Sequence, residues 1–141
     1  MSGRINNLFI KPAHGEPMRA VDAVQAESGQ GLVGDASYGR SKRQVLIINS
    51  ETLQRFALEP GQVRENLTIE GLPLAALPTG TTLRAGDVLL EITVDCAPCH
   101  FLDDIRHGLQ EAMEGQRGKL CRVSGGGKIR LGDEVRIVSP D

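Results

Sequence analysis

The sequence predicts a single domain that is mainly β, with short helices, folded as a closed or nearly closed barrel. Three observations predict it: apolar residues recur in short segments separated by turn residues, 17 residues are glycine, and aromatic residues are scarce, with three Phe, one Tyr and no Trp. Short aliphatic segments favour strands and tight turns over long helices. Closing the sheet into a barrel removes its exposed edges. The 141 residues are enough for one hydrophobic core.

The first half of the chain is expected to form strands at 4–10, 18–26, 44–49 and 64–70, with a helix at 51–58. The unbroken apolar run in 44–49 predicts a strand buried on both faces. Ser50 is placed to cap the helix, and Pro60-Gly61 ends it. The polar segment 32–43 is expected to be an irregular loop.

In the second half, apolar residues alternate with polar ones over 88–95, which is the period of a half-buried strand. Gly86-Asp87 and Gly132-Asp133 lie in similar local sequences and are expected to form tight turns between strands. Helical spacing over 101–113 predicts a helix with a break near Gly108. The closing strands are expected at 120–123 and 134–138.

The net charge of −2 gives no general indication of a nucleic-acid or membrane partner. The chain has no apolar run of about 18 residues that would span a bilayer, and its N-terminus lacks the apolar core of a signal peptide. We therefore expect a cytoplasmic protein. In that compartment the three cysteines are expected to be thiols or metal ligands rather than a disulfide framework.

Two cysteines, Cys96 and Cys99, follow the strand at 88–95, and Pro98 is expected to end strand pairing there. Four interpretations are open. The first is a thioredoxin-type redox motif, although no βαβ pattern surrounds the pair. The second is two buried thiols that act as small apolar side chains. A third is a structural zinc site, built from Cys96, Cys99 and Cys121 with His14, His100 or His107.

The fourth interpretation, which we favour, is a single reactive thiolate at Cys99 that binds a soft metal or carries sulfur. A thiolate needs positive charge nearby. The candidates for that charge are His100, Arg106, His107 and Arg122.

Two polar clusters are candidates for binding an anionic ligand. Arg40, Lys42 and Arg43 lie within four residues, and such a cluster either forms a solvated surface or binds a phosphate through paired N–H donors. Arg64 and Asn66 either begin a surface strand or hold a polar heterocycle, because Asn offers both a donor and an acceptor.

Taken in order, these motifs resemble the MOSC domain, the C-terminal domain of molybdenum cofactor sulfurases. The resemblance covers nearly the whole chain and rests on Gly34-Asp35, the basic segment up to Arg43-Gln44, Pro60-Gly61, Arg64-Glu65-Asn66-Leu67, Gly86-Asp87, Pro98-Cys99 and the segment 129–133. It implies a β-barrel-like fold and a role in handling sulfur or the molybdenum cofactor, molybdopterin.

The resemblance also implies roles for particular residues. Cys99 corresponds to the cysteine that carries sulfur, as a persulfide, or ligates molybdenum. The residues expected to bind the pterin cofactor and its phosphate are Gly34, Asp35, Arg40, Lys42, Arg43, Arg64, Asn66 and Arg122. The sequence has no counterpart of the pyridoxal-phosphate-dependent desulfurase domain, so sulfur is expected to come from a separate donor protein. It also lacks the N-terminal β-barrel domain of the amidoxime-reducing relatives.

Three hypotheses of function follow. The first is a domain that binds the molybdenum cofactor or carries sulfur on Cys99. The second is a molybdenum-dependent reductase of N-hydroxylated substrates, which would need a separate electron-transfer partner because the chain shows neither a Rossmann glycine pattern nor a cluster-type cysteine run. The third is a structural or interaction module braced by zinc.

Overall fold

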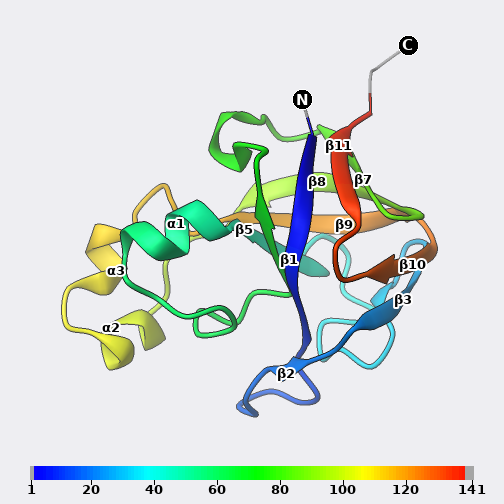
Figure 1. Ribbon diagram of the computed structural model, residues 1–141. Coiled ribbons are helices and arrows are strands. Elements are labelled where there is room, and N and C mark those ends of the chain that lie inside the picture. The colour runs from blue at the N-terminus through cyan, green and yellow to red at the C-terminus, as the bar shows by residue number, and fades with distance from the viewer. Residues whose placement is uncertain (1, 139–141) are drawn as a thin grey trace.

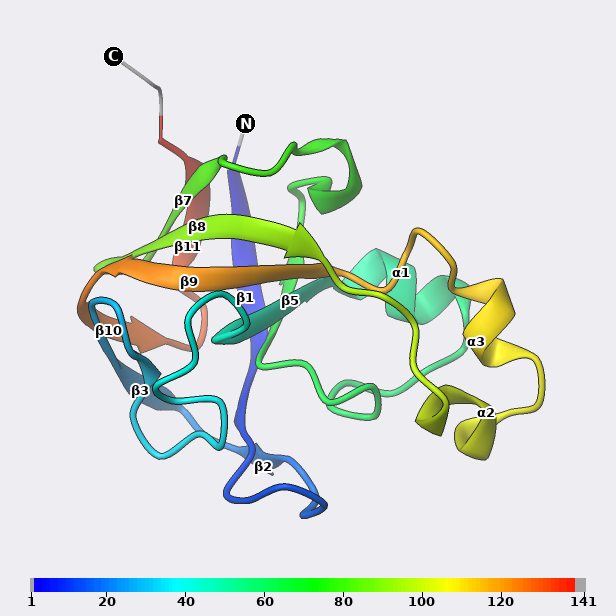
Figure 2. The same ribbon diagram turned by 180° about the vertical axis from the view of Figure 1, so that it is seen from behind.

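The computed structural model describes residues 2–138, and within them seven strands form a closed barrel (Figures 1 and 2). Its strands are β1 (Ser2–Ile10), β5 (Val45–Asn49), β6 (Leu67–Glu70), β7 (Thr82–Ala85), β8 (Val88–Asp95), β9 (Lys119–Gly125) and β11 (Glu134–Ile137). The hydrogen-bonded order is β11-β7-β8-β9-β5-β6-β1, and pairing of β1 with β11 closes the ring. The mainly β, closed fold predicted from the sequence is therefore confirmed.

A small second sheet covers one end of the barrel. It consists of β3 (Ala23–Glu27), β4 (Gly31–Leu32) and β10 (Gly127–Arg130), in the order β10-β3-β4. Val24 of β3 lies opposite Ile129 of β10, and both side chains are buried in the main core. The sheet thus closes the barrel interior with apolar side chains from short strands.

The expected strand at 18–26 is in fact two strands. β2 (Arg19–Ala20) pairs with the end of β1, and β3 then leaves the barrel to join the small sheet. Between them the Val21 amide donates to the Leu8 carbonyl and the Asp22 carbonyl accepts from the Leu131 amide, so the chain changes partner at this point. The sequence prediction also missed β10, which has one buried apolar residue and therefore no alternating pattern.

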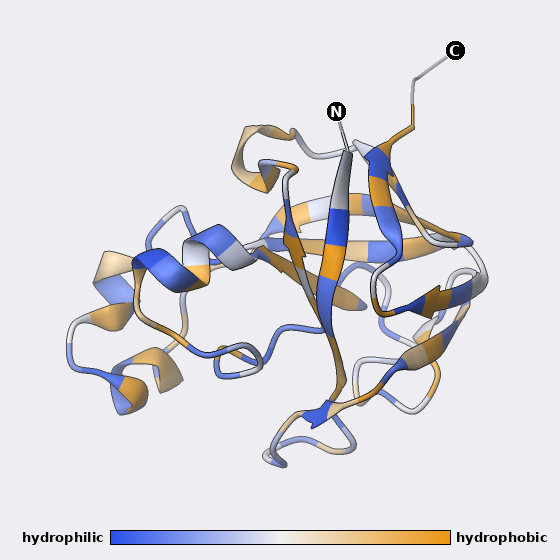
Figure 3. Cartoon of the chain, viewed as in Figure 1, coloured by the Kyte–Doolittle hydropathy of each residue, from blue (hydrophilic) through white to orange (hydrophobic). Residues whose placement is uncertain are grey.

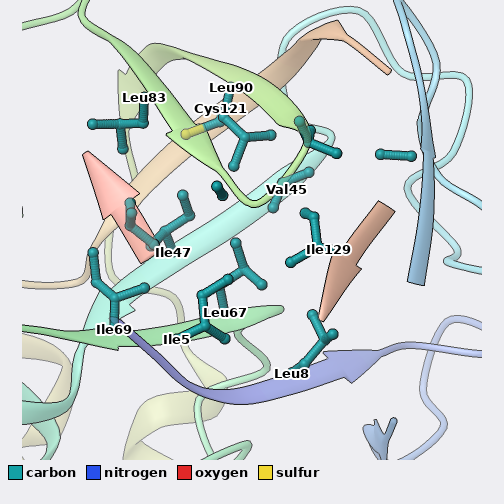
Figure 4. Packing of buried hydrophobic residues seen from close by; sticks show 14 of the residues in the cluster. Ile5, Leu8, Val45, Ile47, Leu67, Ile69, Leu83, Leu90, Cys121 and Ile129 are labelled. Carbon is teal, nitrogen blue, oxygen red and sulfur yellow. The ribbon is translucent and has the colours of Figure 1, made fainter. Parts of the chain in front are cut away.

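Aliphatic side chains from all sides of the ring fill the barrel interior. Figure 4 shows Ile5, Ile47, Leu67, Leu83 and other residues directed toward a common centre. Residues Val45 to Ile48 of β5 are all buried, as predicted, because both faces of this strand are covered. Apolar and polar residues alternate along several of the other barrel strands (Figure 3), which matches strands with one buried face.

Three short helices pack together beside the barrel (Figures 1 and 2). They are α1 (Ser50–Arg55), α2 (Phe101–Ile105) and α3 (Leu109–Ala112), and a 3₁₀ turn lies at Leu74–Ala76. Leu53, Leu102 and Leu109 of these helices form a second apolar cluster with Ile48 on the outer face of β5. None of the helices within residues 2–138 is long and apolar enough to cross a bilayer.

Several local predictions can be compared with these elements. The break between α2 and α3 falls at Gly108, which has φ +86°, as expected. Gly86 and Gly132 also have positive φ at tight turns between strands. The predicted cap of α1 is wrong by one residue: Asn49 is the N-cap, and its side chain bonds to the Leu72 carbonyl and the Leu74 amide instead of capping the helix.

Candidate functional site

A cavity of about 430 Å³ lies where the loops before β5 and β6 meet the segment that follows β8. Figure 2 shows two of these segments, the cyan loop that leads into β5 and the yellow-green chain that leads from β8 to α2. The volume is within the usual range for small-molecule sites. The cavity is lined by Lys11, Asp35, Ser37, Arg40, Arg43, Gln44, Val45, Leu46, Arg64, Asn66, Cys99, His100, Phe101, Arg117 and Leu120.

The cavity contains six of the nine residues that the sequence analysis assigned to the site. Cys99 shares it with Arg40, Arg43 and Arg64, and Asp35 and Asn66 also line its wall. Gly34 and Lys42 do not line it. Lys42 instead lies in a neighbouring surface hollow that also contains Arg40, Ser41 and Arg43.

Of the four predicted sources of positive charge near Cys99, His100 lines the cavity, whereas Arg106, His107 and Arg122 do not. Arg122 does not line the cavity; its Nε donates to Glu91 Oε1 at 2.5 Å across the β8–β9 pair, because its neighbour Cys121 occupies the inward position on β9. Arg106 donates from Nη1 to the Phe56 carbonyl at 2.8 Å and thereby joins α2 to the end of α1. Other cations of the cavity lining carry a permanent charge.

Those cations are four arginines and one lysine: Lys11, Arg40, Arg43, Arg64 and Arg117. Within residues 2–138 none of them forms an ion pair. The lining contains one carboxylate, Asp35, which already accepts hydrogen bonds from the protein. The cavity therefore carries a strong positive potential that favours an anionic ligand.

Asp35 and Asn66 hold the cavity wall together. The Asp35 carboxylate accepts from the Lys11 amide at 2.8 Å and from the Ser37 amide at 3.0 Å. Asn66 Nδ2 donates to Asp35 Oδ1 at 3.0 Å and to the Phe9 carbonyl at 3.2 Å, while its Oδ1 accepts from the Leu46 amide at 2.9 Å. Both amide hydrogens of Asn66 are thus used within the protein, and its main effect on the cavity is to fix the wall.

Two arginines approach the ring of Phe101. The guanidinium carbon of Arg64 lies 4.3 Å from the ring centroid, and that of Arg117 lies 5.5 Å from it. Both distances are within the range of cation–π attraction. Arg64 has φ +66°, a conformation that is uncommon for a residue with a side chain. Phe101 thus connects the two arginines to the segment that carries Cys99.

Arg117 was not identified from the sequence. It precedes β9 and is 3% exposed, although it lines the cavity. Its Nη2 donates to the Val63 carbonyl at 2.5 Å, whereas Nε and Nη1 are buried without a hydrogen-bond partner among the described residues. Because arginines are mostly exposed in folded proteins, nothing in the local sequence indicated that this one is buried. Lys11 was also missed, for lack of any motif around it.

The three cysteines have different environments. Cys99 is exposed in the cavity, with Sγ 3.6 Å from the Ala97 carbonyl oxygen. Cys96 is buried against Leu46 and Leu120, its Sγ lies 3.8 Å from the same oxygen, and burial raises the pKa of its thiol. Cys121 lies in the barrel core (Figure 4), where burial raises the pKa of its thiol to about 12. Of the three, Cys99 has the accessible sulfur.

The position of Cys121 contradicts the proposed zinc arrangement, which required its sulfur beside Cys96 and Cys99. The inward direction of Cys121 follows from its place on β9, opposite Ile92 of β8 and Val45 of β5. Across residues 2–138, no group of three or more His, Cys, Asp or Glu side chains is arranged to hold a metal ion. The strands on either side of the Cys96–Cys99 segment, β8 and β9, are antiparallel, unlike the βαβ setting of a thioredoxin-type motif.

Comparisons with known proteins agree with this architecture. A family model described as the MOSC domain matches residues 11–136. The YUAD protein of Bacillus subtilis has a similar structure, with a TM-score of 0.84 and 19% identity, over 100% of this chain and 98% of that chain. No curated protein matches the sequence.

Two structures of proteins named YiiM are also similar. The Escherichia coli protein gives a TM-score of 0.76 with 22% identity, over 98% of this chain and 71% of that chain. The Geobacillus stearothermophilus protein gives a TM-score of 0.77 with 22% identity, over 97% of this chain and 75% of that chain. At these identities the similarities establish a shared fold.

Proposed function

The chain belongs to the MOSC domain family, and from this premise we propose that its cavity binds the molybdenum cofactor, with which the family is associated. In this proposal Cys99 is the residue that ligates the metal or carries sulfur as a persulfide. One observation supports it above the others: an exposed thiol shares a single cavity with four arginines and a lysine.

The residues in the cavity fit such a ligand. Molybdopterin carries a phosphate, and arginine binds phosphate through paired N–H donors. Thiolate sulfur is a suitable ligand for metals that also bind sulfur. The buried Nε and Nη1 of Arg117 lack partners among residues 2–138, and an anionic ligand would supply the missing acceptors.

Each of these cavity residues has its own role in binding the cofactor. Arg40, Arg43 and Arg64 would hold the phosphate, with Lys11 adding charge. Cys99 would supply the sulfur atom, and Asn66, through its bond to Asp35, keeps the wall in place. When bound, the cofactor would supply a metal centre that can exchange sulfur or electrons.

The proposal also includes a partner and a compartment. Because Cys99 is exposed, its sulfur is accessible to a separate protein that carries a persulfide. The Cys99 thiolate would attack the outer sulfur of that persulfide, the S–S bond of the donor would break, and the donor cysteine would leave as a thiolate. Such a transfer requires a reduced thiol, and reduced thiols are the ordinary state in the cytoplasm. We therefore place this function in the cytoplasm, with a sulfur donor protein as the transient partner.

Purification from cells supplied with molybdate tests the proposal. Bound molybdenum and pterin are measured in wild type, Cys99→Ser and Arg43→Gln, and the mass of the Cys99 peptide is measured for added sulfur. We expect wild type to retain pterin together with metal or added sulfur, Cys99→Ser to lose metal or sulfur, and Arg43→Gln to lose pterin. Arg122→Gln is the matched control, because it removes the same charge outside the cavity. A wild-type protein with neither pterin, nor metal, nor added sulfur would contradict the proposal.

A further inference from the structure

We propose that Cys96 is a resolving thiol, which releases sulfur from Cys99 as hydrosulfide when Cys99 carries a persulfide. The term cysteine pair is used below for Cys96 and Cys99. The other product is a disulfide within the cysteine pair, so the chain has a second activity, the reduction of its own persulfide. The inference rests on the persulfide part of the proposed function and specifies a further fate of the sulfur atom.

The two sulfurs of the cysteine pair are neighbours. Cys96 Sγ lies 3.8 Å from the Ala97 carbonyl oxygen, and Cys99 Sγ lies 3.6 Å from the same atom. Burial raises the pKa of Cys96, and the nearby Cys99 thiol raises it further. The third thiol, Cys121, lies in the barrel core (Figure 4), apart from the small cluster that contains Cys96. Of the three cysteines, Cys96 is therefore the one placed to attack a sulfur on Cys99.

The backbone between the two cysteines allows the sulfurs to meet. The Cys96 amide donates to the Gly118 carbonyl at 3.0 Å, and the Cys99 carbonyl accepts from the Leu102 amide at 3.1 Å. Between these anchors, the amide and carbonyl of Ala97 form no backbone hydrogen bond with any other part of residues 2–138. A disulfide needs Cα atoms about 4–7 Å apart, which two cysteines separated by two residues can reach by backbone rotation alone. Closure of the pair therefore does not require either anchor to break.

The surroundings of the cysteine pair favour release of sulfur into the cavity. Cys96 packs against Leu46 and Leu120, which line the cavity, but Cys96 itself does not line it, whereas Cys99 does. Displacement at sulfur proceeds in line, so attack by Cys96 on Cys99 Sγ directs the outer sulfur away from Cys96. The outer sulfur then departs as an anion among the arginines of the cavity, and their positive charge stabilises it.

The reaction balances without an external oxidant. The Cys96 thiol loses its proton to solvent, its sulfur attacks Cys99 Sγ, and the bond between Cys99 Sγ and the outer sulfur breaks. The electron pair of that bond leaves with the outer sulfur, which departs as hydrosulfide. The transferable sulfur atom is thereby reduced to sulfide, and the two cysteines are oxidised to the disulfide. A low-molecular-weight thiol then reduces the disulfide and restores both thiols.

The buried position of Cys96 makes this release slow. Burial raises the pKa of its thiol, so that little of it is thiolate at neutral pH, and the thiolate is the attacking species. A persulfide on Cys99 therefore persists long enough to be passed to another acceptor. The hydrosulfide route removes the sulfur that no acceptor takes.

Loading the reduced protein with inorganic polysulfide provides the test. After excess polysulfide is removed, released sulfide is trapped with monobromobimane, and the peptide that contains the cysteine pair is analysed by mass spectrometry without reduction. We expect wild type to release its sulfide and to end with a disulfide in the cysteine pair. In Cys96→Ala the persulfide should remain on Cys99, and sulfide release should be at least about tenfold slower, because the intramolecular attack is lost.

Cys121→Ala is the matched control, because it removes the other buried thiol by the same substitution. This variant should release sulfide at the wild-type rate. Circular dichroism checks that both variants are folded, and the wild-type products test the inference without either variant. The rate in wild type should also be independent of protein concentration, as expected for a reaction within one chain.

Four results would overturn the inference: Cys99 takes up no sulfur, its persulfide persists without release of sulfide, Cys96→Ala releases sulfide at the wild-type rate, or the added sulfur moves to Cys96. These results are distinct from a failure of the proposed function, because polysulfide loads Cys99 without pterin or metal. A protein that retains no pterin, metal or sulfur in cells, yet releases sulfide in this test, would remove the proposed function and leave the reaction of the cysteine pair standing.

Discussion

Replacing Asn66 by Ala is expected to destabilise the fold by an amount that can be derived from its contacts. The side chain makes three hydrogen bonds, to the Leu46 amide, the Phe9 carbonyl and the Asp35 carboxylate, and Asn66 is 5% exposed. Loss of the hydrogen bond from Asn66 costs less free energy at the Phe9 and Asp35 oxygens, which are acceptors, than loss of the bond to Asn66 costs at the buried Leu46 N–H. Because an unsatisfied buried group costs about 1–3 kcal/mol, we expect a loss of about 2–5 kcal/mol in the free energy of unfolding.

Urea unfolding followed by circular dichroism measures this loss. The midpoint should fall while the dependence on urea stays the same, and the melting temperature should fall by roughly 5–15 °C for a chain of this size. Asn6→Ala is the matched control, since the exposed Asn6 makes a single side-chain bond, to Ser50 Oγ at 2.8 Å. Asn66→Asp should also be destabilising, because it places a second carboxylate against Asp35. Equal losses in Asn66→Ala and Asn6→Ala would refute the assigned role of Asn66.

Two further predictions follow from burial. Iodoacetamide at neutral pH should alkylate Cys99 first, because Cys96 and Cys121 are buried and burial raises the pKa of both thiols. Peptide mass spectrometry after limited labelling measures the order of alkylation. Equal labelling of all three cysteines would contradict this prediction. Burial also raises the pKa of the Glu65 carboxyl, so the folded state binds its proton more tightly than the unfolded state does. The stability gained is present below the ordinary pKa and is lost as pH rises through the raised pKa. Glu65→Gln should remove this decline, and an unchanged pH profile of stability in the variant would disprove it.

Two strands of the barrel show how burial leaves a signal in the sequence. Alternation over 88–95 and the unbroken apolar run in β5 both reflect burial directly, so these strands were found. β10 was missed because Ile129 is its one buried apolar residue, and the partner that stabilises it, β3, is about a hundred residues away in the chain. Pairing across that separation leaves no signal in a local window.

In the candidate site, too, some residues carry a local sequence signal and others do not. Cys99, Arg43 and Arg64 line the cavity, and each lies in a sequence motif that has a chemical meaning by itself. Arg122 lies outside the cavity because Cys121 takes the inward position on β9, and the sequence does not show which face of β9 each residue occupies. Arg117 was missed for the complementary reason: its place in the cavity wall depends on burial beside Phe101, a residue on a different element.

The pairing of β1 with β11 has a consequence for how the protein is made. Ser2 lies opposite Arg136, so the seam of the ring joins strands at opposite ends of the described chain (Figure 1). A ribosome delivers β1 long before β11, and during that interval the nascent sheet has an unpaired edge. The ring can close only after residues 134–137 have left the exit tunnel, so folding of the barrel is completed late, and contacts of such long sequence separation make it slow.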